Sequence, residues 1–303
     1  MIAVTGANGY IAQATLRFLA SNSQPVVAVS RGRPSYQPPD GVIWRDSEGI
    51  SSLSELFLGC ESVIHLAGLA HVRSKKKPEV EFDLANRKYA LDIAANAKVA
   101  GVKKFIFVST VGVHGSWSPS VINSDSPISP DTSYALSKAK AETELEIFCL
   151  ENHMQLCIVR PPMVYGPRCP GNFSRLVRLV KSGLPLPFGA ATAVRSFIHV
   201  DNLASFLALC AISEFKEIAK VVISDGSDWS TKELVQGISL ALGISQKLFN
   251  MPEKLIYFLG RPLGLERQLN SLFKPMRIGC EADVNLLNWT PVFDVRSGFG
   301  SVV

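Results

Sequence analysis

Short apolar stretches rich in β-branched residues alternate with longer stretches of mixed polarity through the first half of the chain. Six apolar stretches predict strands buried on both faces, at residues 2–6, 25–30, 41–45, 61–68, 103–110 and 155–162. Three other stretches carry apolar positions at three- and four-residue steps and predict helices, at residues 9–22, 83–101 and 133–152. This alternation is typical of βαβ units, so it predicts an α/β fold with a doubly wound parallel sheet.

The pattern changes in RPPMVYGPRCPG, residues 160–171, where four prolines and two glycines interrupt it. Such a stretch predicts a departure from the sheet. A helical pattern at residues 173–181, a late strand at 220–224 and several short helices follow. We therefore expect a sheet domain at residues 1–166 and a smaller mixed lobe at residues 167–303, interleaved with the sheet, that shapes a substrate pocket.

Composition narrows the class of protein. The 303 residues are 47% hydrophobic and 19% charged, which supports a substantial core and argues against disorder. The net charge of +5 favours anionic partners such as phosphates. The basic cluster RSKKKP at residues 73–78 is interpreted as a solvated loop rim, because nucleic-acid binding would need more charge with interleaved aromatic residues.

Cysteine, histidine and hydropathy patterns indicate the compartment. Six cysteines are scattered without a C-x-x-C pair, and five histidines show no metal-ligand spacing. We therefore expect no disulfide framework, no metal site and a reducing compartment. Strand-like residues begin at Ile2, and no apolar run reaches the roughly 18 residues needed to span a bilayer. These observations predict a cytoplasmic protein without membrane insertion.

A glycine-containing turn, TGANGYIA at residues 5–12, joins the first predicted strand to the first predicted helix. Gly6 would allow the tight turn and Gly9 the close approach of a phosphate, which the helix N-terminus then attracts. Ala12 stands where a third glycine is common, and alanine is accepted at that packing position. The turn predicts dinucleotide binding within residues 1–166, with a purely structural turn as the alternative.

The end of the second strand carries the residue expected to contact the adenosine ribose. An acid there would indicate NAD, but the sequence is AVSRGRP, with Ser30 at that place and Arg31 after it. An arginine can bind the 2′-phosphate, so Arg31 favours NADP slightly and leaves NAD open. Asp46, after the third strand, could contact the adenine amide. Small residues in HLAGLA, residues 65–70, would let the backbone line the cofactor.

The strongest local signal is SYALSK, which places Tyr134 and Lys138 on one face of a predicted helix. A tyrosine has a pKa of about 10, and a nearby ammonium favours the phenolate, so the pair can form a general acid/base. The fifth strand ends in Ser109 and Thr110, either of which could bind the reacting oxygen of an alcohol or ketone.

Together these features resemble the extended short-chain dehydrogenases/reductases, and within them the NAD-dependent epimerase/dehydratase family that acts on nucleotide sugars. The resemblance runs nearly end to end, through VTGANGYIA, VIHLAG, DLANRKYAL, FVSTVGVHG, SYALSK, RPPMVYGP, NFSRLVRLV and RSFIHVDNLA. It implies a Rossmann-like fold with a smaller mixed C-terminal lobe that binds the nucleotide sugar.

The resemblance also implies roles for individual residues. The implied catalytic residues are Thr110, Tyr134 and Lys138, with Ser109 as the less favoured hydroxyl. The implied cofactor-binding residues are Gly6, Asn8, Gly9, Tyr10, Ile11, Ser30, Arg31, Asp46, Leu66, Ala67, Gly68, Asn86, Ser109, Tyr134, Lys138, Pro161 and Val164. The implied substrate-binding residues are Thr110, Asn172, Leu186, Arg195 and Arg267. A surface arginine at 195 and a helix cap at Asn172 are the alternatives for those two positions.

The family contains several reactions, and the sequence separates some of them. Its 4,6-dehydratases carry an Asp-Glu pair after the catalytic threonine, where this chain has Val111 and Gly112, so dehydration is not expected. Hydride transfer at C4 remains. The segment from RPPMVYGP onward resembles a bacterial surface-polysaccharide (lipopolysaccharide) subgroup of UDP-N-acetylquinovosamine-type 4-ketoreductases. This favours reduction of a UDP-4-keto-6-deoxy-HexNAc, with 4-epimerisation of UDP-glucose or UDP-GlcNAc as the alternative.

Two further readings stay open. Some members of the superfamily bind NADP without turnover and act as sensors, but they tend to lose the Tyr/Lys pair that this chain keeps. Extended relatives often form homodimers through the helices that here span residues 79–98 and 132–148. Tyr89, Ile93 and Leu145 would serve that contact or the core.

Overall fold

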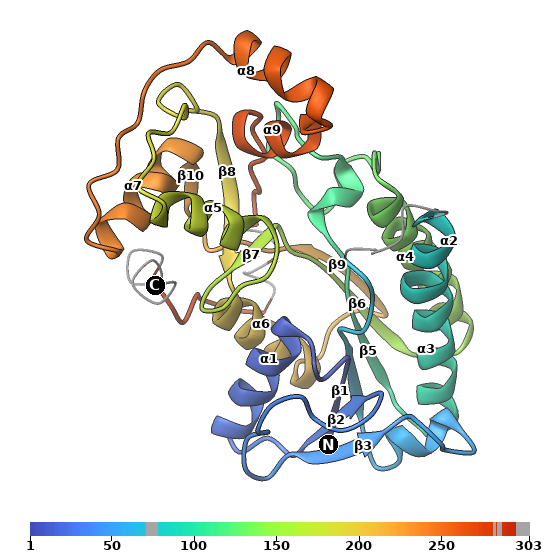
Figure 1. The fold of residues 1–303 in the computed structure, drawn as a ribbon. Helices are drawn as coiled ribbons and strands as arrows, with labels where there is room; N and C mark the ends of the chain where they lie inside the picture. The colour runs from blue at the N-terminus through green and yellow to red at the C-terminus, as the bar shows by residue number, and fades with distance from the viewer. Residues whose placement is uncertain (71–77, 281–282, 284–286, 295–303) are drawn as a thin grey trace.

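A seven-stranded parallel sheet forms the centre of the molecule in a computed structural model that describes residues 1–70, 78–280, 283 and 287–294. The strand order is β3-β2-β1-β4-β5-β6-β9, so the chain starts at β1 and winds outward in both directions (Figure 1). The strands span Ile2–Thr5 (β1), Val26–Ser30 (β2), Ile43–Asp46 (β3), Ser62–His65 (β4), Lys104–Val108 (β5), Gln155–Arg160 (β6) and Ile218–Val222 (β9). This doubly wound arrangement confirms the predicted α/β fold.

Two helical layers cover the two faces of this sheet. Alternate strand residues such as Val4 and Ile64 pack against α1 and α6, whereas Ala3 and Val63 face α3 and α4. The helices on these faces span Tyr10–Ser21 (α1), Tyr89–Val99 (α3), Ser133–Glu151 (α4) and Val200–Ile212 (α6). Because both faces are covered, the central strands β1, β2 and β4 are buried along their whole length, as their sequences predicted. The prediction was wrong for the strand at residues 41–45, because β3 lies at the edge of the sheet, with Ile43 48% exposed and Trp44, Arg45 and Asp46 only partly buried.

A smaller lobe is built on a second sheet of order β10-β8-β7, which is separate from the first. Its elements are β7 (Met163–Tyr165), α5 (Asn172–Lys181), β8 (Val194–His199), β10 (Asp228–Ser230), α7 (Thr231–Ala241), α8 (Glu253–Gly260) and α9 (Glu266–Phe273). Their apolar residues form a core of their own around Phe173, Val235 and Phe273. Figure 1 shows this lobe standing over one end of the large sheet, with α8 farthest from it.

The chain crosses between the two parts more than once. After β7 and α5 it returns to the large sheet through α6 and β9, and then enters the lobe again at β10. Residues beyond 166 therefore contribute both a covering helix, α6, and an edge strand, β9, to the large sheet.

Three short helical segments complete the path of the chain between these elements. They are η1 (Leu53–Phe57), η3 (Val111–His114) and η4 (Arg261–Leu263). The helix predicted at residues 83–101 is a composite: α2 (Pro78–Phe82) continues through a π-helical turn, η2 (Asp83–Lys88), into α3. Among the described residues, no helix is long and apolar enough to cross a bilayer.

The three residues considered for a dimer contact do not present an outward apolar face. Ile93 and Leu145 are fully buried between α3, α4 and the sheet. Tyr89 packs against His65 at a centroid distance of 6.0 Å and lines a cleft described below. The core alternative therefore holds for Ile93 and Leu145. The basic cluster predicted as a loop rim lies almost wholly in residues 71–77, outside the described part of the chain.

Candidate functional site

The glycine turn brings the backbone of β1 against that of β4. Gly6 has a φ of +69°, and a Cβ added there would lie 2.7 Å from both N and Cα of Ala67. Gly9 caps α1, and its N–H donates to the Gly6 carbonyl at 2.7 Å. The following helix leaves its first N–H groups without intrahelical partners, as an anion site requires. A side chain at Gly6 would therefore displace the loop that faces the cleft.

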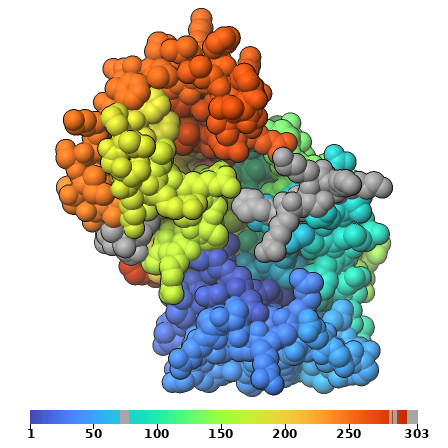
Figure 2. Space-filling view, viewed as in Figure 1, coloured from blue at the N-terminus to red at the C-terminus, as the bar shows by residue number. Residues whose placement is uncertain are grey.

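A cleft of about 500 Å³ opens beside this turn at the carboxyl ends of β1, β2 and β4. Its lining comprises Gly6, Asn8, Gly9, Val29, Ser30, Arg31, Leu66, Ala67, Gly68, Leu69, Leu84, Ala85 and Tyr89. Most of the cofactor-binding residues predicted before β5 meet here. Figure 2 shows the surface recessed where the lobe meets the N-terminal layer. The glycine cradle and the open N-terminus of α1 fit the diphosphate of a dinucleotide.

Hydrogen bonds made by side chains fix the rim of this cleft at the end of β2. The Asn8 Oδ1 atom accepts hydrogen bonds from Ser35 N at 2.8 Å and Ser35 Oγ at 3.0 Å. Ser30 Oγ donates to the Gly32 carbonyl, and Asp46 Oδ1 accepts from Gly32 N at 2.7 Å. Asp46 therefore shapes the 30–35 loop directly, while the exposed Arg31 lines the cleft.

Asn86 fastens the β4 loop to the helix that carries Tyr134. Its Oδ1 accepts from Leu69 N at 2.7 Å, and its Nδ2 donates to Leu69 O and Ser137 Oγ, both at 3.0 Å. A Cβ at Gly68 would lie 2.7 Å from the same Oδ1. Asn86 is fully buried, so it contributes to the cofactor site by positioning the loop that lines the cleft.

The Tyr134 and Lys138 side chains project from the first two turns of α4, which Thr132 caps through a hydrogen bond from Ala135 N. Tyr134 is half-buried against Phe82 at a centroid distance of 5.8 Å, and burial raises the pKa of its phenol to about 12. Lys138 is buried, donates from Nζ to Val108 O at 2.9 Å and lies 4.5 Å from the Phe107 centroid. Burial lowers the Lys138 pKa to about 8, against the opposing effect of Glu142.

The sequence predicts that Lys138 favours the Tyr134 phenolate. In this structure Lys138 donates its hydrogen bond to a backbone carbonyl, and burial raises the pKa of the phenol. The effect of Lys138 on the phenol stays a prediction.

Thr110 and Ser109 have different surroundings at the end of β5. Thr110 Oγ1 accepts from Gly112 N at 3.1 Å, which orients the hydroxyl and leaves its proton to donate. Ser109 Oγ donates to the buried carboxylate of Glu142. Ser109 was expected among the cofactor ligands, but its hydroxyl is already used inside the protein. Of the two strand-end hydroxyls, Thr110 is therefore the one whose proton stays available to a ligand.

Glu142 belongs to a buried ion pair beneath these residues. Arg160 Nη2 lies 2.7 Å from Glu142 Oε2, and Arg160 Nε lies 3.2 Å from Oε1. The same guanidinium donates from Nη1 to Ser124 O at 2.9 Å and lies 3.3 Å from His114 Nε2. This network joins α4, the end of β6 and the turn after Thr110.

The segment after β6 brings the lobe to the cleft. Pro161 is buried, and its carbonyl accepts from Val111 N at 2.9 Å. Val164 packs with Tyr10 against Ala14 and Val200. Burial raises the pKa of Tyr10, whose hydroxyl would lie 2.8 Å from a Cβ at Gly166.

Tyr10 and Ile11 therefore pack inward. Ile11 is partly buried against the core on the α1 and α6 face of the sheet. Tyr10 packs between α1, α6 and the lobe. Both residues were expected among the cofactor ligands, and with inward side chains only their backbone groups would be available for that role.

The lobe residues expected to bind substrate differ in their surroundings. Arg195 Nη1 donates to Lys274 O at 2.7 Å and Nη2 to Ser116 O at 3.2 Å. Burial lowers the Arg195 pKa to about 10. Asn172 is exposed at the start of α5, which Gly171 rather than Asn172 caps, and Arg267 is exposed on α9. Leu186 is buried in the lobe core, and both its backbone groups bond to residues 247 and 249. It offers a substrate no free polar group, which corrects that expectation.

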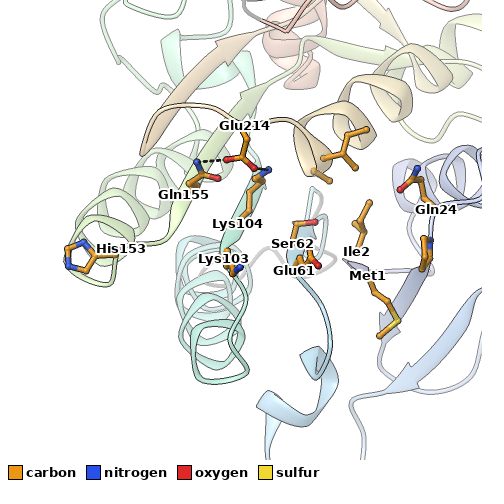
Figure 3. Close-up of a pocket in the computed structure, with 13 residues that line it drawn as sticks. Met1, Ile2, Gln24, Glu61, Ser62, Lys103, Lys104, His153, Gln155 and Glu214 are labelled. Atoms are coloured by element: carbon orange, nitrogen blue, oxygen red, sulfur yellow. Dashed lines mark hydrogen bonds and ion pairs between the residues drawn. The ribbon is translucent and has the colours of Figure 1, made fainter.

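A second cavity, of about 460 Å³, lies at the opposite edge of the sheet, among the first residues of β1, β4, β5 and β6 (Figure 3). Lys104 Nζ donates to Ser213 O there, and Gln155 Nε2 lies 3.3 Å from Glu214. None of the predicted catalytic, cofactor-binding or substrate-binding residues lines it. The candidate site is therefore the cleft at the carboxyl ends of the strands, where doubly wound sheets bind their ligands.

Tyr89 and Glu142 are among the residues of this region that sequence reasoning did not assign to the site. Tyr89 lines the cleft beside Arg31, and a single aromatic residue in a helical pattern gave no signal for it. Glu142 was detectable, because it lies four residues after Lys138 and eight after Tyr134 on the buried face of the predicted helix. A carboxylate on such a face requires a buried partner.

We expect the Glu142→Gln substitution to lower the free energy of unfolding by about 3–5 kcal/mol, because it leaves the Arg160 charge buried and unpaired. Urea unfolding measures this. Glu144→Gln on the same helix is the matched control, since Glu144 pairs with Arg87 at a partly exposed position and its loss should cost under about 1 kcal/mol. Equal losses in the two variants would contradict the assignment.

Lys138 gives a pH dependence that can be measured against Lys138→Met. The pKa of Lys138 is about 8 in the native state and higher in the unfolded chain. At a pH between these two pKa values, the unfolded chain binds a proton at Lys138 that the native chain has lost. Stability then rises with pH. From pH ~7 to pH ~10 the unfolding free energy of the wild type should rise by about 2–3 kcal/mol relative to the variant. A constant difference would show that Lys138 titrates normally.

Comparison with known proteins agrees with this geometry. A UDP-glucose 4-epimerase of Vibrio cholerae is 29% identical over 98% of this chain and 93% of its own. A ceramide reductase of Caulobacter vibrioides is 27% identical over 96% of this chain and 86% of its own.

Solved structures share the fold. A UDP-N-acetylglucosamine 4-epimerase from Methanobrevibacter ruminantium superposes with a TM-score of 0.81 at 19% identity, covering 99% of this chain and 96% of that one. A UDP-glucuronic acid 4-epimerase from Bacillus cereus in complex with NAD gives 0.80 at 20% identity, with coverage of 99% and 94%. The model of the NAD dependent epimerase/dehydratase family matches residues 2–223. With the glycine cradle, the strand-end Thr110 and the Tyr134/Lys138 helix in the order that the sequence predicted, the chain belongs to this family.

Proposed function

We propose that the chain transfers hydride between a nicotinamide cofactor and C4 of a UDP-activated sugar, and that its net reaction is reduction of a UDP-4-keto-6-deoxy-HexNAc. The observation that carries this proposal is geometric: the Thr110 hydroxyl at the end of β5 lies beside the start of α4, which carries Tyr134. A Cβ at Gly112 would lie 3.3 Å from Thr110 Oγ1 and 3.8 Å from the Cβ of Ala135, the residue after Tyr134. A phenol in this place can protonate the alkoxide that results when a ketone is reduced. The resemblance of the segment from residue 160 onward to 4-ketoreductases favours reduction over epimerisation.

Each residue has one role in this scheme. A nicotinamide dinucleotide, when bound, supplies the hydride. Tyr134 donates its proton to the oxygen at C4, and Thr110 donates a hydrogen bond to the same oxygen and orients it. Lys138 donates to one backbone carbonyl, and burial lowers its pKa. When the cofactor is bound, the ammonium can donate to the cofactor ribose instead, and its positive charge then favours the Tyr134 phenolate.

The cofactor residues fit a dinucleotide through their backbone. Gly6 and Gly9 leave room for the diphosphate, and Ala67 and Gly68 line the opposite wall of the cleft. Arg31 stands exposed at the end of β2 without an acid beside it in the sequence, so we propose NADP as the favoured cofactor. NAD is the alternative, since the family is named for it.

Arg195 is the proposed ligand of the substrate diphosphate. Its hydrogen-bond acceptors within the described residues are neutral: the Lys274 and Ser116 carbonyls and the Met276 sulfur. The lowered pKa reflects the desolvation of its charge. An anion would compensate for this desolvation. Asn172 and Arg267 are proposed as further contacts from the lobe.

A 4-epimerase is the second candidate. The specific observation in its favour is the name of the Vibrio cholerae relative, a UDP-glucose 4-epimerase that aligns over 98% of this chain. The same three residues would act twice, first removing and then returning hydride at C4 of UDP-glucose or UDP-GlcNAc. A dehydratase is not proposed, because Val111 and Gly112 follow Thr110 where that reaction needs carboxylates.

Two broader statements complete the proposal. The retained Tyr134/Lys138 pair argues against a non-catalytic NADP sensor. We also propose a cytoplasmic location, a role in bacterial surface-polysaccharide biosynthesis and a homodimer.

The purified protein, incubated with NADPH or NADH and a UDP-4-keto-6-deoxy-HexNAc, should oxidise the reduced cofactor in proportion to the sugar added. Loss of nicotinamide absorbance measures this, and a preference for NADPH would support the role of Arg31. No loss, together with interconversion of UDP-GlcNAc and UDP-GalNAc without added cofactor, would identify the epimerase. Neither activity would contradict the proposed function.

Tyr134→Phe should lower kcat by roughly 10²–10⁴-fold, because it removes the proton donor and keeps the ring that packs on Phe82. Binding of the reduced cofactor, followed by fluorescence, should change little. Tyr257→Phe is the matched control, since that hydroxyl bonds Asn270 in the lobe. A Tyr134→Phe variant with wild-type kcat would assign the proton to another group.

A further inference from the structure

The segment formed by α8 and η4 is apolar on two faces. On its inner face Ile256 is buried, and a Cβ at Gly260 would lie 2.6 Å from Leu269 Cδ1 of α9. Tyr257 Oη donates to Asn270 Oδ1 at 2.7 Å. These contacts fix the segment on the lobe. A helix with apolar side chains on opposite faces is normally buried on both of them. This helix contacts the protein on its inner face and is exposed on the other.

The outer face exposes large side chains. Leu255 is 45% exposed, Phe258 73%, Leu259 55% and Leu263 72%. They follow one another at positions i, i+3, i+4 and i+8, so they form one stripe rather than scattered surface residues. We call this stripe the α8 face. Figure 1 places α8 at the end of the lobe farthest from β1 and β3.

The apolar surface continues beyond the helix. A groove of about 1130 Å³ runs beside α8, and its lining includes Trp117, Tyr257, Phe258 and Pro262. Trp117 is exposed in the loop after η3. Tryptophan and tyrosine are the side chains that favour the interface between water and lipid.

The charges around the α8 face have one net sign. Its two acids are paired, Glu253 with Lys274 at 3.0 Å and Glu266 with Arg261 at 3.5 Å. Lys254 is exposed in the lining of the same groove, and no carboxylate among the described residues lies within ion-pair distance of it. The rim therefore presents an uncompensated cation beside an apolar stripe.

We propose that the α8 face docks on the surface of an anionic lipid bilayer. An apolar stripe with a cationic rim is the pattern of a helix that lies in the headgroup region. A second copy of the chain fits less well, because it would bring the unpaired Lys254 of each copy to the same apolar face. This docking is peripheral, which agrees with the lack of a spanning helix in the described residues, and it is independent of the proposed reaction. It would hold the lobe at the membrane with the nucleotide sheet in solution.

The test is flotation of the full-length protein with vesicles of phosphatidylcholine containing about one third phosphatidylglycerol, against vesicles of phosphatidylcholine alone. The wild type should float with the anionic vesicles and dissociate at high salt. Phe258→Ser/Leu259→Ser should lower partitioning by at least about tenfold, because it removes the apolar stripe. Lys254→Glu should lower it on anionic vesicles only.

Two controls separate docking from a general surface effect. Leu240→Ser removes another exposed leucine, 84% exposed on α7, and Lys103→Glu reverses an exposed lysine at the far edge of the sheet. Both variants should float like the wild type. Wild-type protein that stays unbound, or that binds neutral vesicles equally well, would overturn the proposal. So would a dimer in sedimentation that Phe258→Ser/Leu259→Ser converts to monomer without any vesicle binding, since a second copy would then cover the face.

Discussion

A buried carboxylate–guanidinium pair, Glu142 with Arg160, holds together the three chain segments that carry the reacting groups. Glu142 lies one turn after Lys138 on α4, Arg160 ends β6 just before the segment that leads to the lobe, and Ser109 donates to the same carboxylate. Because both charges are buried, neither can leave without exposing the other to an apolar surrounding. The pair therefore fixes the distance between the strand end that presents Thr110 and the helix that presents Tyr134.

The rest of the site divides its tasks between backbone and side chains. The cofactor cleft is formed largely by main chain, at the Gly6 turn and at the Ala67–Gly68 loop that Asn86 holds in place. The lobe supplies charge instead, through a guanidinium with neutral acceptors at Arg195. The two parts meet through Pro161 and Val164, so the reacting groups lie between a rigid nucleotide sheet and a separately packed lobe. At this junction, burial raises the pKa of Tyr134 and lowers the pKa of Lys138.

Much of this arrangement could be predicted because its signals are local. Apolar runs such as FIFV are typical of strands buried on both faces, and the spacing of Tyr134 and Lys138 puts both on one face of a predicted helix. Other features depend on contacts between distant residues. Nothing in DLANRK marks the π-helical turn that buries Asn86, and no local pattern shows that Ser109 meets Glu142. The sequence around Leu186 gives no sign that its side chain is buried in the lobe core. The apolar segment at α8 has the periodicity of a buried helix, so its exposed face could be recognised only from the structure.

The central claim is that hydride passes between the nicotinamide and C4 of the sugar, a step common to the ketoreductase and the epimerase. The most direct measurement uses reduced cofactor deuterated at the transferable position with a UDP-4-keto-6-deoxy-HexNAc, followed by mass spectrometry and NMR of the sugar product. We expect one deuterium at C4 of the product. A product without deuterium at C4, or label that remains on the cofactor while the sugar is converted, would contradict the account.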